Sequence, residues 1–191
     1  MYCWVIFLKL KFEVFEVFKA FKALVDKLRG RKIKVLRNDN GKEYINKKLQ
    51  NICEENGIQM QHYVPYPPQQ NGLSERKNRE LKEMATCMLE TKYLSPKKWD
   101  EATNCVSYFH NIFTHKSLEE KNPFEAWSAH KTNVSHFMVF GSKDWAIIPS
   151  KKRNGLKPER KKSIMVGYFE YEKGYKIFDL SSQKKFIERS V

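Results

Sequence analysis

The sequence has few of the residues that hold small secreted proteins together, with four cysteines in 191 positions. These cysteines lie far apart and form no Cys-x-x-Cys pair, and the five histidines are scattered as well. A disulfide framework or a zinc site needs clustered ligands, so we expect neither in this chain. The same pattern predicts a reducing compartment, either the cytosol or the nucleus.

The sequence also lacks a hydrophobic stretch that could cross a membrane, since no apolar run approaches the roughly 18 residues of a spanning helix. Its apolar start, Met1 to Leu8, has no basic leader and no small-residue cleavage site, and it continues into Lys9 and Lys11. These features argue against a signal peptide. We therefore expect an intracellular protein, nuclear or cytoplasmic, with no membrane partner.

Positive charge is what the sequence has in excess. Lysine and arginine total 36 against 22 acidic residues, which gives a net charge of +14 and a pI near 9.6. Hydrophobic residues make up 41% of the chain and aromatic residues 14%, enough for a real core, which excludes disorder throughout. The surplus charge must then lie on a surface, and such a surface typically binds nucleic acid or an anionic membrane.

The first 130 residues alternate between strand and helix patterns, which is typical of an α/β domain. We expect strands at 3–8, 32–37 and 58–63, and helices at 11–29, 43–55, 73–92, 96–115 and 123–130. The prolines at 65, 67 and 68 are expected to break regular structure ahead of the helix at 73–92.

The last third of the chain has a different character, and we interpret residues 131–191 as a small β-rich C-terminal region. Its expected strands lie at 137–140, 145–148, 164–168 and 175–178. A basic stretch from Lys151 to Lys162 carries seven lysines or arginines and one acid, Glu159. This stretch is more typical of a solvated loop than of a localisation or DNA-binding signal.

Asp39 is the first candidate for chemistry, because it directly follows an expected buried strand and precedes Asn40 and Gly41. In open α/β sheets, ligands bind in the crevice beyond the carboxyl ends of the strands. A second interpretation stays open, since aspartate also supports tight turns.

Glu75 is the second candidate and lies near the start of the expected helix at 73–92. Helical spacing places an apolar stripe at Leu81, Met84, Ala85 and Met88, and places Glu75 with Arg79, Lys82 and Thr86 on the opposite face. The helix dipole alone could explain one acid in a first turn. It does not explain the basic residues that accompany Glu75 (Arg76, Lys77, Arg79 and Lys82), which suit a phosphate backbone beside an acid that could hold a metal ion.

Several segments resemble the integrase of Copia-type (Ty1/copia) retrotransposon Pol polyproteins. The proline-rich segment ahead of Glu75, with its Gln-Gln-Asn-Gly sequence, is highly specific, and the 35 residues between Asp39 and Glu75 match the spacing of this family's Asp-Asp-Glu signature. The resemblance follows the order of the chain through Leu36–Tyr44, Pro65–Arg79, Asn122–Trp127, His136–Gly141, Val166–Tyr168 and Lys173–Tyr175.

The resemblance implies a ribonuclease H-like catalytic core in which two aspartates and a glutamate hold Mg²⁺ or Mn²⁺ for DNA strand transfer. It makes Asp39 the second acid and Glu75 the third. It also implies that Gln70, Asn71 and the basic residues Arg76, Lys77, Arg79 and Lys82 contact DNA, that the ends of the element and the target are the DNA partners, and that copies associate.

The family's first acid lies on a strand upstream of the segment that matches residues 2–8, so the resemblance implies a core that lacks its first two strands. Glu13 and Glu16 fall on the following helix and cannot replace that acid. We therefore expect an integrase fragment over residues 1–130, inactive alone, with the β-rich region at 131–191 behind it. A non-catalytic basic nucleic-acid-binding protein derived from the element is the alternative, and an inert relic is a third. Target-site preference, oligomeric state and expression stay open.

Overall fold

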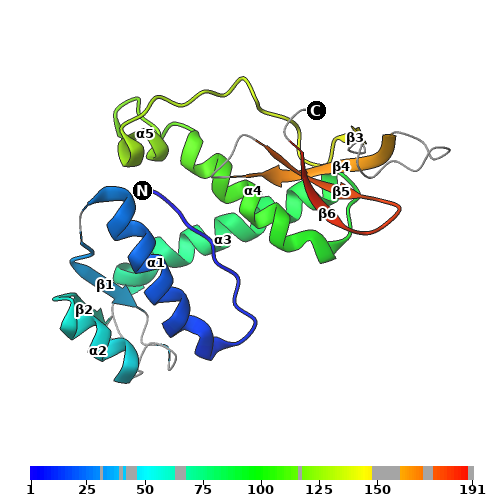
Figure 1. The fold of residues 1–191 in the computed structure, drawn as a ribbon. Coiled ribbons are helices and arrows are strands. Elements are labelled where there is room, and N and C mark those ends of the chain that lie inside the picture. Colours follow the sequence, from blue (N-terminus) through cyan, green and yellow to red (C-terminus); the bar gives the residue numbers. More distant parts are fainter. Residues whose placement is uncertain are drawn as a thin grey trace. The chain divides into compact units, whose positions relative to one another are not determined.

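The computed structural model describes residues 1–30, 32–38, 41, 47–62, 68–115, 118–147, 160–169 and 174–188. These residues form two compact units (Figure 1). One unit contains Ile6–Lys77, and the other combines Met1–Val5 with Asn78–Val191. Helices and small sheets occur together along the chain, which confirms the expected α/β class. The predicted domain boundary at residue 130 is not tested by these units and stays a prediction.

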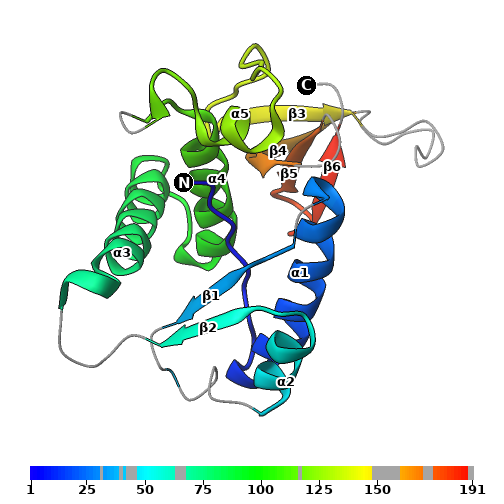
Figure 2. The ribbon, with the colours of Figure 1, turned by 90° about the vertical axis from the view of Figure 1, so that its left-hand side faces the viewer.

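The unit of residues 6–77 contains a two-stranded parallel sheet. Strand β1 (Val35–Asn38) pairs with β2 (Gln59–His62), and α2 (Lys47–Glu55) lies on the crossover between them (Figure 2). A helical crossover is what two parallel strands require. Ahead of β1 lie a 3₁₀ turn, η1 (Lys11–Glu13), and helix α1 (Val14–Arg29), which ends at Gly30 with φ of 60°. A glycine in this left-handed conformation is a common helix C-terminus.

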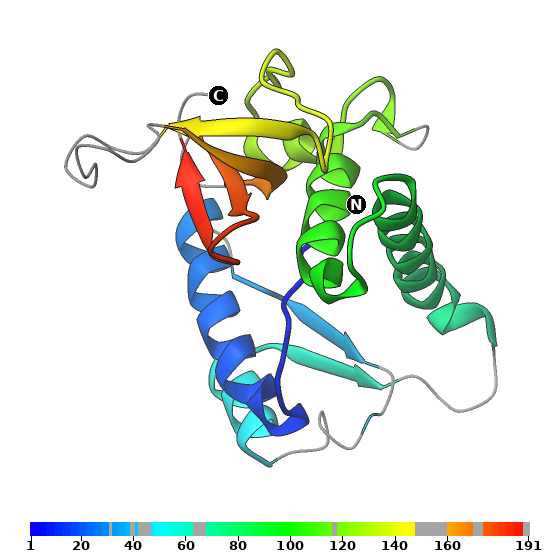
Figure 3. The same cartoon turned by 90° about the vertical axis from the view of Figure 1, so that its right-hand side faces the viewer.

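The other unit packs helix α4 (Trp99–Ile112) against a four-stranded antiparallel sheet (Figure 3). Its core combines α4 residues such as Ala102 and Val106 with Met165 and Ile177 of the sheet, all almost completely buried. Helix α3 (Pro68–Thr91) contributes its C-terminal half to this core, and η2 (Pro96–Lys98) and α5 (Pro123–Ser128) flank α4 in sequence. The strands, in spatial order, are β3 (Lys143–Ile147), β4 (Arg160–Tyr168), β5 (Tyr175–Asp179) and β6 (Lys185–Glu188).

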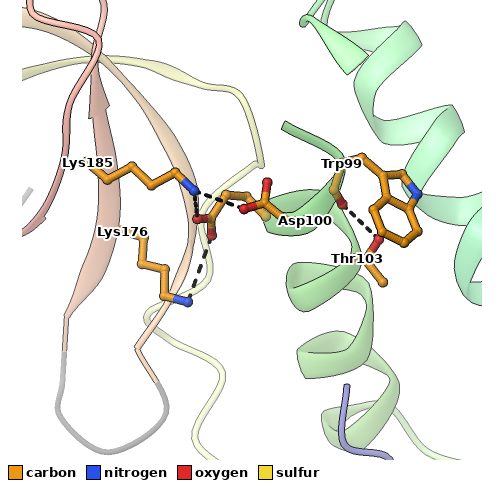
Figure 4. A network of polar contacts seen from close by, with 6 residues as sticks. Trp99, Asp100, Thr103, Lys176 and Lys185 are labelled. Carbon is orange, nitrogen blue, oxygen red and sulfur yellow. Dashed lines mark hydrogen bonds and ion pairs between the residues drawn. The ribbon is translucent and has the colours of Figure 1, made fainter. Parts of the chain in front are cut away.

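A charged cluster ties the first turn of α4 to the sheet (Figure 4). The ammonium of Lys185 on β6 donates to the carboxylates of Glu101 and, at 3.0 Å, of Asp100. Lys176 on β5 lies 3.9 Å from the other Glu101 oxygen, and Glu101 itself is buried. Burial lowers the pKa of Lys185, but hydrogen bonds and charge attraction from Glu101 and Asp100 outweigh it, so the net pKa is raised. The protonated lysine is therefore the form that holds sheet and helix together.

The predicted strand at 3–8 is wrong, because residues 1–8 pair with no strand among the described residues. Helix α4 instead holds this segment through its side chains. Asn111 accepts a hydrogen bond from the Cys3 backbone N–H and donates one to the Cys3 carbonyl, both at 2.7 Å. The hydroxyl of Ser107 donates to the same carbonyl at 3.2 Å. The backbone polar groups at Cys3 are satisfied without a sheet.

The predicted strand at 137–140 is also wrong, since these residues form no ladder. The hydroxyl of Tyr168 replaces a neighbouring strand here: it accepts from the Met138 N–H at 2.9 Å and donates to the Met138 carbonyl at 2.7 Å. The strands expected at 164–168 and 175–178 are confirmed by β4 and β5, whereas β6 was not expected. Residues 151–159 of the basic stretch lie outside the described residues. In the described part of the chain, no helix is long and apolar enough to cross a membrane.

Candidate nucleic-acid interface

The carboxyl end of β1 is the edge at which Asp39 was expected to act. Asn38, the last residue of β1, pairs with His62, the last residue of β2. Since the strands are parallel, the chain leaves both at the same edge of the sheet, where α/β proteins place ligands. Asp39 itself lies outside the described residues, so its approach to Glu75 stays a prediction.

Glu75 lies about two turns inside α3 rather than at its start. The helix begins at Pro68 instead of Leu73, because proline is well tolerated at a first helical position. No acidic residue occurs in the first turn, and the dipole effect fades beyond that turn. The helix dipole therefore does not account for Glu75, whose side chain is exposed.

Three of the four predicted basic residues on α3 are exposed: Arg76, Arg79 and Lys82. Arg79 follows Glu75 by one helical turn and Lys82 follows by two, so these side chains share a face. Lys77 does not belong to that face. It is half-buried and lies one turn before buried Leu81 in the helical register.

The buried face of α3 consists of Leu81, Ala85 and Leu89, exposed by 7%, 0% and 5%. Of the predicted apolar stripe, Met88 is half-buried, but Met84 is 43% exposed, so that part of the prediction is wrong. Helical packing selects the i, i+4, i+8 row and turns the opposite side, with Arg79 and Lys82, towards solvent.

Gln70 and Asn71 belong to the first turn of α3, although the sequence predicted a break there. The structure does not describe their side chains, so their predicted DNA contacts stay predictions. The nearby Tyr63–Pro67 segment also lies outside the described residues.

A magnesium site needs several oxygen ligands that converge on one point. Within the described ranges, no three His, Cys, Asp or Glu side chains come together in this way. Asp39 lies outside the described residues, so the metal site predicted at Asp39 and Glu75 stays a prediction. Glu13 is engaged locally, since its carboxylate accepts from the backbone N–H of Lys9 at 2.9 Å.

Thiol chemistry has no support from the buried cysteines. Burial raises the pKa of Cys105 to about 12, with a smaller raising effect of Glu101 and an opposing effect of Lys176. Burial also raises the pKa of Cys53, aided by Glu54. Because the thiolate is the reactive form, both cysteines serve as core residues.

The cluster of Asp100, Glu101 and Lys185 was missed by the sequence analysis. Lys185 lies 84 residues after Glu101 in the chain, and neither residue stands in a motif. A local sequence pattern cannot predict an ion pair between residues so far apart in the chain.

Comparison with known families finds a match for the C-terminal region. The model of the retroviral polymerase SH3-like domain matches residues 142–191. This range contains β3 to β6 and therefore the whole antiparallel sheet.

Curated relatives match nearly the whole chain. The retrovirus-related Pol polyprotein from transposon TNT 1-94 of Nicotiana tabacum is 36% identical over 188 residues, which cover 98% of this chain and 14% of that protein. The Pol polyprotein from transposon RE2 of Arabidopsis thaliana is 27% identical over 190 residues, which cover 100% of this chain and 13% of that protein. The chain thus spans only a small part of the length of the curated relatives it matches.

A solved structure supports the fold. It is the cryoEM structure of the simian T-cell lymphotropic virus intasome in complex with the PP2A regulatory subunit B56 gamma. It has a TM-score of 0.50 and 19% identity, and the match covers 96% of this chain and 66% of that one. At this identity the likeness concerns the fold alone.

Proposed function

This chain corresponds to the integrase region of retrotransposon Pol polyproteins, and on that premise we propose that it binds DNA for integrase-type strand transfer. Its relation to Pol regions supports an integrase-related role. The substrate class, the DNA of element ends and target, is our proposal. So are a ribonuclease H-like arrangement of the core and association between copies.

The observation that carries the proposal is the exposed face of α3. Glu75 lies there with Arg79 and Lys82, and Arg76 is exposed beside it. Cations spaced along a helix can neutralise successive phosphates, while an exposed carboxylate among them would repel DNA unless it served another purpose. Holding a cation is the purpose that fits an acid at this place.

We propose that Asp39 and Glu75 supply two of the carboxylates that hold Mg²⁺ or Mn²⁺. A bound pair of such ions supplies activation of the attacking oxygen and stabilisation of the leaving oxygen in phosphoryl transfer. The protein residues bind and orient the DNA: Arg76, Arg79 and Lys82 contact phosphates and bring the backbone to the two acids.

We further propose that the 191-residue chain does not transfer strands by itself. The resemblance assigns the second and third acids to Asp39 and Glu75 and assigns no residue of this chain to the first. In the described ranges, no group of three His, Cys, Asp or Glu side chains comes together. Two ligands would hold a metal ion loosely, and in-line transfer depends on tight alignment.

DNA binding is tested by fluorescence anisotropy with a labelled duplex over a range of salt concentrations. We expect the logarithm of the affinity to fall with the logarithm of salt by about 0.9 for each phosphate neutralised. Reversing Arg76, Arg79 and Lys82 to glutamate should weaken binding and flatten this slope. The matched control reverses three exposed lysines of η1 and α1 (Lys11, Lys19 and Lys27). Equal losses from the two triple variants would show that α3 is not the contact surface.

A further inference from the structure

A pocket of about 290 Å³ lies outside the α3 face, among residues of a single unit. Residues from the N-terminal segment, α4, α5, the loop after α5 and the position directly after β4 line it. Four of its lining residues are aromatic: Tyr2, Tyr108, Phe124 and Phe169. Polar residues of the loop after α5 (His130, Lys131, Thr132 and Asn133) also line it, together with Asn111, Ile112 and His136.

Hydrogen bonds and ring contacts fix the aromatic walls. The Asn111 side chain clamps Cys3, which positions the neighbouring Tyr2. The Tyr108 ring stacks on Tyr168 with centroids 4.5 Å apart, and its hydroxyl is 2.7 Å from Nε2 of His136. A ring held on both its face and its hydroxyl is a preformed surface.

The polar wall is fixed as well. The Glu125 carboxylate accepts from the Thr132 backbone N–H at 3.0 Å, and Asn122 donates to the Thr132 hydroxyl at 2.8 Å. These bonds hold the backbone next to Lys131, whose side chain is exposed. The lining therefore combines an exposed cation with aromatic rings.

We propose that this pocket takes one unpaired nucleobase of a DNA strand, with the adjoining phosphate at Lys131. Flat apolar walls suit the face of a base, since stacking on aromatic side chains is how proteins hold unpaired bases. The volume lies at the lower end for small-ligand sites, which suits a single base rather than a dinucleotide. The exposed lysine complements a phosphate and argues against a purely apolar ligand. The choice of DNA rests on the proposed function.

The test is an NMR titration of the full chain with deoxyadenosine 5′-monophosphate. The matched probe is 2-deoxyribose 5-phosphate, which carries the same phosphate and no base. We expect the nucleotide to shift the signals of Tyr108, Thr132 and His136, and to bind about tenfold more tightly than the sugar phosphate. Equal affinity for the two probes would overturn the proposal and leave an anion site. Shifts confined to other residues, or none, would overturn it as well.

Variants locate the effect. Phe124→Leu keeps an apolar side chain but removes the ring, so it should abolish the preference for the nucleotide. Phe113→Leu, at the exposed end of α4 and outside the pocket lining, is the matched control and should keep it. Tyr2→Leu, at another aromatic residue of the lining, gives a second test if the NMR spectrum of the Phe124 variant shows unfolding. A preference that survives both pocket variants would overturn the proposal.

Failure of the pocket proposal can be distinguished from failure of the proposed function. A chain that binds duplex DNA in a salt-dependent way but shows no preference for the base refutes the pocket alone. A chain that binds the nucleotide in the pocket but no duplex refutes the proposed function alone.

Discussion

Asn111 on α4 closes a two-bond ring with the backbone of Cys3, although the two residues lie 108 positions apart in the chain. The amide oxygen accepts from the Cys3 N–H and the amide nitrogen donates to the Cys3 carbonyl, each over 2.7 Å. Asn111 is only 4% exposed. A side-chain amide thus does for this extended segment what a neighbouring strand would do.

Asn111→Asp tests this clamp. The substitution keeps an acceptor for the Cys3 N–H but replaces the donor with a carboxylate oxygen that faces the Cys3 carbonyl. We expect a loss of about 1–3 kcal/mol in the free energy of unfolding, together with faster hydrogen exchange at the Cys3 amide. Urea denaturation and NMR exchange measure the two effects.

Asn133→Asp is the control for that variant, because Asn133 is exposed and its side-chain oxygen accepts from the Ser135 backbone N–H. Aspartate preserves that bond, so stability should change little. Equal stability of the two variants would contradict the account of the clamp.

The cluster at the start of α4 predicts unequal effects from two neighbouring acids. The Glu101 side chain is 8% exposed and that of Asp100 is 43% exposed, and both bind Lys185. We expect Glu101→Gln to lower the free energy of unfolding by about 1–3 kcal/mol. Asp100→Asn should cost about 0.5 kcal/mol or less, since solvent screens the exposed pair. Urea denaturation of both variants decides; a larger loss from Asp100→Asn would refute the assignment.

The hydrogen bonds to Glu125 predict a contribution to stability that is lost at acidic pH. The backbone N–H groups of Thr132 and then Asn122 donate to its carboxylate and hold its pKa below the ordinary value of 4.5, against a smaller effect of burial. A lowered pKa means that the stabilisation is present above the ordinary value and is lost as pH falls through the lower one. The stability difference between the wild type and Glu125→Gln should therefore shrink as pH falls below about 4.5. Urea titrations at a series of pH values measure this; a constant difference would contradict it.

Local patterns predicted most of the helices, because the spacing of apolar residues is a property of one segment. Helices α1, α2 and α4 fall within their expected ranges. The strand prediction at 3–8 was wrong because an apolar run does not reveal what its backbone will bind. Asn111, which binds the backbone of Cys3, is distant in the chain. The strand prediction at 137–140 was wrong for the same reason, since the hydroxyl of distant Tyr168 makes the hydrogen bonds to the Met138 backbone.

The candidate site divides in a similar way. Exposure of Glu75, Arg76, Arg79 and Lys82 follows from helical spacing and agrees with the structure. The half-burial of Lys77 depends on where the helix begins and which row packs, and neither is local information. The pocket bounded by Tyr2, Tyr108 and Phe169 combines three distant parts of the chain, so no motif could indicate it.

The most direct test of the proposed function is a strand-joining assay with the purified 191-residue chain. The reaction contains Mg²⁺ or Mn²⁺ and a labelled duplex that carries an element end, and duplex binding in the same sample shows that the protein is active for DNA. Glu75→Gln removes the proposed metal ligand, and Glu83→Gln, an exposed acid on the same helix, is the matched control. We predict that the wild-type chain binds DNA but gives no more joined product than the Glu75→Gln variant. Joined products that Glu75→Gln abolishes and Glu83→Gln retains would contradict the claim that this chain alone is inactive.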